Sequence, residues 1–154
     1  MTRYELLLFL HILGAIVWFG GGVLLSVLAA QARKSGDPEA VLKLLQESDT
    51  VGNKVFFPAS LVLLVAGILL VTLEDIGDWE DLWILTGIGG FVVSVFLGIF
   101  FYGPTGKKIG AAVEAGGPWD PAVMTLVDRY LLVARLDLLV LLVVVFAMTT
   151  KPGA

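Results

Sequence analysis

Four long apolar segments dominate this chain of 154 residues. They cover approximately residues 5–31, 55–74, 82–102 and 129–149. A helix of about 20 apolar residues spans the roughly 30 Å hydrocarbon core of a bilayer. In lipid only a helix or a closed barrel satisfies its own backbone, and these segments lack the alternation of barrel strands. The sequence therefore predicts an all-α integral membrane protein, a four-helix bundle in which the chain is one domain.

The composition narrows the classes of partner and site. Hydrophobic residues make up 58% of the chain, above the roughly 45–50% of soluble domains, so the lipid bilayer is the expected surrounding. No basic stripe suggests a nucleic-acid partner. The chain contains no cysteine and a single histidine. It therefore has no disulfide, no thiolate site and no metal site built on several imidazoles of one chain.

Positive charge is concentrated in two of the connections between spans. The basic residues of these connections are Arg33, Lys34, Lys43, Lys54, Lys107, Lys108 and Arg129. The connection between the second and third spans carries only acidic charge. The positive-inside rule therefore places connections 32–54 and 103–128 in the cytoplasm and both termini outside. We expect a plasma membrane of the prokaryotic inner-membrane type.

Capping signals predict two helix starts outside the apolar segments. Asp37 can cap a helix whose first position is Pro38. As a helix, residues 39–47 would have one apolar face and one polar face. We therefore expect a short interfacial helix on the cytoplasmic membrane surface. Asp120 and Pro121 repeat the signal and indicate that the last helix begins before it enters the bilayer.

Small residues at four-residue steps predict close helix packing. Gly22 and Ser26 lie on one side of the first span. Gly90, Ser94 and Gly98 form the strongest ladder, in the third span. Small side chains let two membrane helices approach closely. Because such a face can also join separate chains, we expect a homo-oligomer or other membrane subunits as partners.

His11 lies about 10 Å below the outer surface of the predicted bundle. A neutral imidazole in a low-dielectric site suits haem iron, whereas a histidine without a ligand would hydrogen-bond to a neighbouring helix. Trp18, on the same helical face, would line such a site. Met148 is expected in the same leaflet, so His11 and Met148 could clamp a haem from two helices. Met148 could equally fill a gap in the packing.

Arg135 and Asp137 are charged residues inside the fourth span. A charge in the bilayer costs roughly 2.5 kcal/mol or more and usually faces the bundle interior. Two residues apart, these side chains do not share a helical face. Arg135 can snorkel toward the inner surface. Asp137 lies deeper and needs a partner, a proton or water, which favours a role in proton transfer or in holding a polar ligand.

The first two spans resemble those of a known family. His11 is followed seven residues later by Trp18 and Phe19, which is similar to the first span of the HemJ-type protoporphyrinogen oxidases. Pro58 with Gly67 nine residues later resembles their second span. The chain is therefore identified as a member of a broad group that holds HemJ, the CopD copper-resistance membrane domains and an uncharacterised family of predicted integral membrane proteins.

The resemblance implies a helical bundle that binds haem b through His11. The fourth span has Arg135, Leu136 and Asp137 where HemJ carries an Asn-Glu-x-Pro pattern, so the uncharacterised family is the closer fit. Three functions stay open at this stage. They are a haem-binding redox protein through His11, a transport-related protein for a proton or metal cation through Asp137, and a non-catalytic assembly subunit that packs through Gly98 and its ladder.

Overall fold

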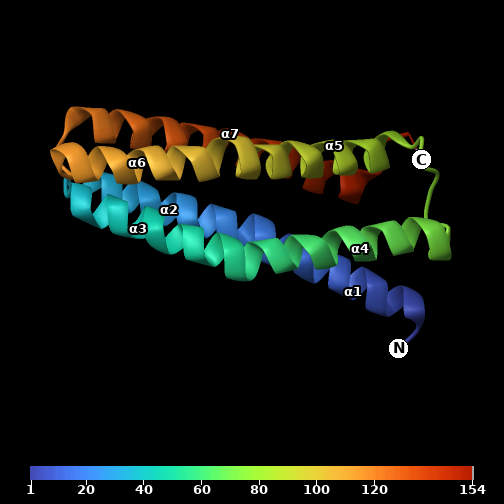
Figure 1. Cartoon of the computed structure of the whole chain (residues 1–154). Helices are drawn as coiled ribbons and strands as arrows, with labels where there is room; N and C mark the ends of the chain where they lie inside the picture. The colour runs from blue at the N-terminus through green and yellow to red at the C-terminus, as the bar shows by residue number, and fades with distance from the viewer. Residues whose placement is uncertain (154) are drawn as a thin grey trace.

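A computed structural model describes residues 1–153, which form four long helices packed side by side (Figure 1). Each of the first three contains one π-helical turn, marked η, between two α-helical segments. The segments are α1 (Arg3–Ala15), η1 (Ile16–Gly20), α2 (Gly21–Lys34), α3 (Pro38–Val51), η2 (Gly52–Phe56), α4 (Phe57–Glu74), α5 (Leu82–Leu97), η3 (Gly98–Tyr102), α6 (Gly103–Gly116) and α7 (Pro121–Thr150). All four helices are long and apolar enough to cross a membrane, which confirms the predicted all-α four-helix fold.

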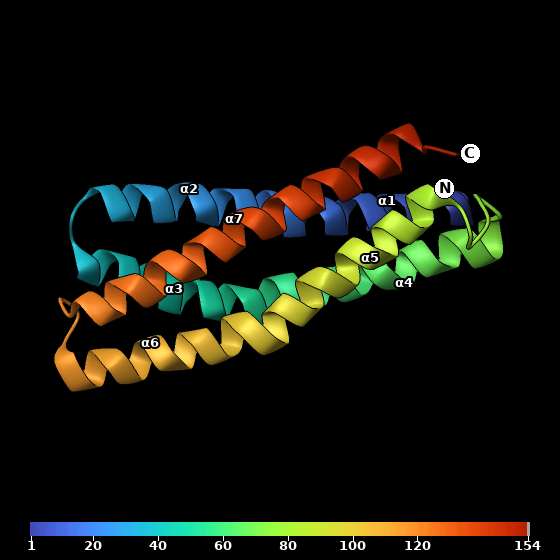
Figure 2. The ribbon, with the colours of Figure 1, turned by 90° about the horizontal axis from the view of Figure 1, so that it is seen from above.

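The helices form two hairpins that lie in two layers and cross each other (Figures 1 and 2). In the first hairpin α1 packs along α4, and in the second α5 packs along α7. The layers meet where α2 and η1 contact α7. The ring of Trp18 in η1 also packs edge-on against Phe91 in α5, with 5.4 Å between the ring centroids.

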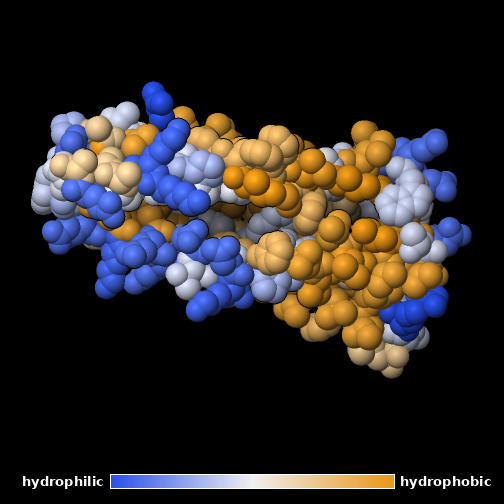
Figure 3. Space-filling view, viewed as in Figure 1, coloured by the Kyte–Doolittle hydropathy of each residue, from blue (hydrophilic) through white to orange (hydrophobic). Residues whose placement is uncertain are grey.

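The helices are longer than a bilayer requires. They contain 32, 37, 35 and 30 residues, or about 45–56 Å at 1.5 Å per residue, against a hydrocarbon core of roughly 30 Å. Figure 3 shows where the excess lies, because one end of the bundle is apolar and the other is rich in hydrophilic residues. We call the end with α3, α6, the last turns of α2 and the first turns of α7 the charged half. The end with α1, α4, α5 and the rest of α7 is the apolar half.

The predicted interfacial helix forms, but its direction differs from the prediction. Asp37 caps α3 by accepting a 2.9 Å hydrogen bond from the backbone N–H of Glu39, and Pro38 occupies the first turn. However, α3 continues through η2 into α4 as one helix of 37 residues. The expectation of a helix lying on the membrane surface is therefore wrong, because α3 runs along the bundle and buries its apolar side against α2.

Two of the three π-helical turns lie just before a proline. Pro58 is the second residue after η2, and Pro104 is the second residue after η3. Proline has no N–H to donate, and its ring crowds the carbonyl of the preceding helical turn. A π-helical turn widens the helix at that point, so the chain can continue without ending the helix. Connection 103–128 is accordingly mostly helical, and α7 starts at Pro121 under the predicted Asp120 cap, whose Oδ1 accepts from the N–H of Ala122 at 2.8 Å.

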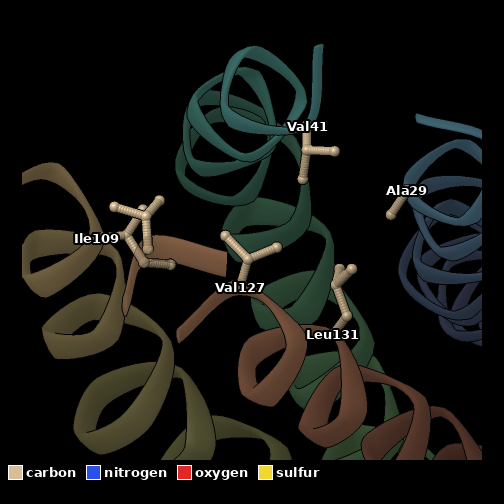
Figure 4. Packing of buried hydrophobic residues seen from close by; sticks show 6 residues of the cluster. Ala29, Val41, Ile109, Val127 and Leu131 are labelled. Atoms are coloured by element: carbon tan, nitrogen blue, oxygen red, sulfur yellow. The ribbon is translucent and has the colours of Figure 1, made fainter. Parts of the chain in front are cut away.

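The charged half has a core of its own (Figure 4). The buried side chains of this core are Ala29, Val41, Ile109, Val123, Val127 and Leu131, which come from α2, α3, α6 and α7. At its surface Arg33 binds both carboxylate oxygens of Asp128, at 2.8 and 3.0 Å. This bidentate hydrogen bond from the Arg33 guanidinium lowers the pKa of Asp128. The pair is largely exposed, so it contributes little beyond fixing α2 against α7.

The close approach of α1 and α4 predicts a sharp difference between two glycines. A Cβ at Gly14 would lie 2.8 Å from the Leu63 Cβ and 2.9 Å from the Ala59 carbonyl oxygen, whereas a Cβ at Gly89 meets no atom within 4 Å. Gly14→Ala should destabilise the protein by about 1–3 kcal/mol, because backbone atoms must move. Gly89→Ala should leave stability unchanged or slightly higher. Denaturant unfolding in mild detergent, followed by circular dichroism, measures both, and equal stability of the two variants would contradict this packing.

Candidate functional site

A carboxyl group, Asp137, is held between α5 and α7 in the apolar half. Ser94 on α5 donates its hydroxyl hydrogen to Asp137 Oδ1 at 2.5 Å. The hydroxyl of Tyr102, in η3, lies 3.5 Å from Asp137 Oδ2 and forms a longer hydrogen bond to it. Ser94 is buried and Asp137 is half-buried. The carboxyl therefore takes hydroxyl hydrogen bonds on both of its oxygens from a neighbouring helix.

The depth of this cluster follows from its position along the helix. Asp137 lies about 20 Å along α7 from Thr150, at 1.5 Å per residue, within a hydrocarbon core of roughly 30 Å. Close packing brings Ser94 to it, because a Cβ at Gly90 would lie 2.2 Å from Val144 Cγ2. Gly90 and Ser94 of the predicted ladder thus face α7 of the same chain, whereas Gly98 is exposed with no atom near its Cβ position.

Two tyrosines connect the carboxyl to the charged half. The rings of Tyr102 and Tyr130 lie 5.1 Å apart between centroids. Tyr130 packs against the core of the charged half, beside Val127 and Leu131. Tyr102 belongs to the π-helical turn η3, and π-helical turns inside α-helices are frequent at functional sites. Two contacting tyrosine rings therefore lie between the core of the charged half and Asp137.

The opposite side of the carboxyl is closed by apolar packing between α5 and α7. Gly90 faces Val140 and Val144, and a Cβ at Gly87 would lie 1.9 Å from Met148 Cε. Beyond them Trp83 forms a buried cluster with Ile84 and Ala147. Met148 packs against this cluster, which is the gap-filling role that the sequence left open for it.

His11 lies in the other hairpin. Its Nδ1 is 2.9 Å from the carbonyl oxygen of Leu63 on α4, and a Cβ at Gly67 would be 3.0 Å from its Cε1. The ring is thus held between α1 and α4, while Met148 packs against α5. The two side chains therefore come from different helix pairs, and a haem held by His11 together with Met148 stays a prediction. Ligation by His11 alone stays a prediction.

The remaining predicted residues lie at separate places. Arg135 is exposed on α7, whereas Asp137 is half-buried and turned toward α5. Gly22 faces Leu138 of α7, where a Cβ would meet its Cδ2 at 2.9 Å. Ser26 is half-buried on α2. Within residues 1–153, no group of three or more His, Asp or Glu side chains is placed to hold a metal ion.

Neither Tyr102 nor Tyr130 was among the candidate site residues that the sequence singled out. A signal was available for Tyr130, which lies two helical turns before Asp137 and so shares its face of α7. No comparable signal marked the partner of His11, because that partner is the main-chain carbonyl of Leu63.

These features define a helical integral membrane protein with a hydrogen-bonded carboxyl inside its spanning region. The chain belongs to the family described as predicted integral membrane protein (DUF2269), whose model matches residues 5–152. This match confirms the predicted membership of an uncharacterised integral membrane family. No curated protein and no solved structure matches the chain.

Proposed function

We propose that this protein exchanges a proton or a small cation at Asp137 within the membrane. The observation that carries the proposal is the 2.5 Å hydrogen bond between Ser94 and Asp137 across two spanning helices. Ionisable residues inside transmembrane segments are rare and typically belong to ion pathways or proton relays. Arg135 is exposed, and the partners of the carboxyl are the hydroxyls of Ser94 and Tyr102. Hydroxyl partners leave the carboxyl able to bind and release a cation.

The proposal predicts that flux depends on this one carboxyl. Asp137→Asn removes the exchangeable group while keeping the side-chain shape. In vesicles containing the purified protein, proton or cation uptake after a concentration step should fall to the level of protein-free vesicles. Asp128→Asn is the matched control, since it changes an exposed carboxylate on the same helix, and it should leave uptake unchanged. Wild-type uptake in the Asp137→Asn protein would refute the proposal.

We further propose that the charged half faces the cytoplasm of a cell bounded by a plasma membrane. Support comes from the basic residues, because Arg33, Lys43 and Lys107 belong to the charged half and cytoplasmic segments are enriched in Lys and Arg. Both termini and the acidic turn at residues 75–81 would then lie outside.

The absence of cysteine from the sequence makes this orientation directly testable. Ser35 follows α2 and Asp78 lies in the turn between α4 and α5, so they are at opposite ends of the bundle (Figure 1), and both are exposed. In intact cells a membrane-impermeant maleimide should label Asp78→Cys at once, and Ser35→Cys only after the cells are broken. The reverse pattern would show that the orientation is inverted.

A second candidate function, haem-dependent redox chemistry, rests on the geometry of His11 and on the resemblance to HemJ and CopD proteins. With Nδ1 hydrogen-bonded to the Leu63 carbonyl, Nε2 is the ring nitrogen left to bind iron, and such a hydrogen bond orients a ligating histidine. A bound haem b would supply one-electron chemistry. The same two helices, α1 and α4, also form a depression of about 310 Å³ whose apolar lining includes Leu7, Leu10 and Val65.

This candidate predicts a coloured protein. Gently purified protein should show a Soret band and sharp bands after reduction, and His11→Ala should remove them. Tyr4→Phe, on the same helix, should keep them. A colourless wild-type protein, after expression with added haem precursor, would exclude His11 as a haem ligand and leave the proposal for Asp137 untouched.

A further inference from the structure

We infer that the species exchanged at Asp137 is a proton, and that it reaches the carboxyl only from the charged half, through the hydroxyls of Tyr102 and Tyr130. This inference rests on the proposed function of Asp137. It adds the identity of the species, the side of access and two residues on the path.

The chemistry of the partners favours a proton. Ser94 and Tyr102 point hydroxyl hydrogens at the two carboxylate oxygens. A hydroxyl both donates and accepts a hydrogen bond, so it can give up one proton while it takes another. In the transfer, the O–H proton of Tyr102 moves to Asp137 Oδ2. The Tyr102 oxygen takes its replacement from a hydronium ion at the charged half, either directly or by way of the Tyr130 hydroxyl, which is reprotonated in turn. One O–H bond therefore forms for each that breaks, and no electron is transferred.

The path begins in the charged half. Tyr130 packs against the core of that half. The Tyr130 ring contacts Tyr102, with centroids 5.1 Å apart and planes at 51°. Both tyrosines are half-buried, so neither is sealed inside the bundle.

No equivalent path leads from the opposite side among the described contacts of α5 and α7. From Asp137 toward the apolar end, the packed groups are Gly90 on Val144, Gly87 on Met148, and the buried Trp83. The side chains of valine and methionine carry no exchangeable proton. The indole N–H of Trp83 is exchangeable, but it is donated to Asp81 Oδ2 at 3.2 Å. Access is therefore from one side.

Few titratable or charged side chains lie near Asp137. Ser94 and Tyr102 face it from α5 and η3. On its own helix the nearest charged or titratable groups along the chain are Tyr130 and Arg135. The contact of α7 with α2 next to it is apolar, between Leu138 and Gly22. Asp128 is already paired with Arg33.

The test measures when Asp137 is protonated and from which side. A hydrophobic carbodiimide adds covalently to protonated carboxyls inside membranes, and mass spectrometry locates the adduct. The full-length protein is placed in sealed membrane vesicles of known orientation, and the pH is stepped on one side at a time. Labelling of Asp137 should follow the pH on the side of the charged half and ignore the other side. Tyr102→Phe and Tyr130→Phe should slow the response at least about tenfold, as expected for the loss of a proton-transferring side chain.

Tyr4→Phe is the control, because Tyr4 is exposed at the far end of α1 and should not alter the response. Equal unfolding midpoints of the three variants would show that the tyrosine changes act on proton access and not on folding. Labelling that follows the pH of the opposite side, or rates unchanged in both Tyr102→Phe and Tyr130→Phe, would overturn this inference while leaving Asp137 as the exchanging group. A carboxyl that never responds to pH on either side would overturn the proposed function as well.

Discussion

The close approach of α5 and α7 is the contact on which the candidate site depends. Gly87 and Gly90 have no side chain, so Met148 and Val144 of α7 occupy the space where a Cβ would stand. In a membrane, helices associate through such packing and through polar contacts, since lipid provides no hydrophobic drive between them. The same approach brings Ser94 within hydrogen-bonding distance of Asp137. A bulky residue at position 90 would separate the two helices and leave the carboxyl without its donor.

The helices are longer than the bilayer is thick, and their excess length forms the charged half with its own core. Helices of 30–37 residues exceed the roughly 30 Å hydrocarbon core by several turns, and the excess gathers at one end. There a separate core around Val123 and Val127, both 0% exposed, holds all four helices together. The apolar half consists instead of two helix pairs, α1 with α4 and α5 with α7. The charged half thus helps to fix the two hairpins relative to each other.

Local features of the sequence predicted most of the fold, and long-range features were not predictable. The four spans follow from length and hydropathy alone, and the caps at Asp37 and Asp120 follow from short-range hydrogen bonding. The direction of α3 depends on how residues 52–56 pass into α4 without a break, and on the packing of Val41 in a core to which α2, α6 and α7 also contribute. A surface helix and an upright helix show the same amphipathic pattern, so the pattern could not separate them.

The sequence indicated Asp137 of the candidate site but not its partners, because those partners depend on long-range packing. An isolated intramembrane carboxyl such as Asp137 is conspicuous in any apolar segment, whereas its partners are ordinary residues of another helix. Ser94 was recognised as a packing residue, and its second role as a donor depends on the register between α5 and α7. His11 was equally conspicuous, but its hydrogen bond goes to a backbone carbonyl, which every residue possesses. The placement of Met148 in the other hairpin could not be read from its depth alone.

The central claim is that Asp137 gains and loses a proton inside the membrane. Infrared difference spectroscopy of the reconstituted protein, recorded between acid and alkaline buffers, observes the carbonyl stretch of protonated carboxyl groups directly. We expect a band that shifts in heavy water, persists in Asp128→Asn and disappears in Asp137→Asn. A difference spectrum that is the same for wild-type protein and Asp137→Asn would contradict this claim.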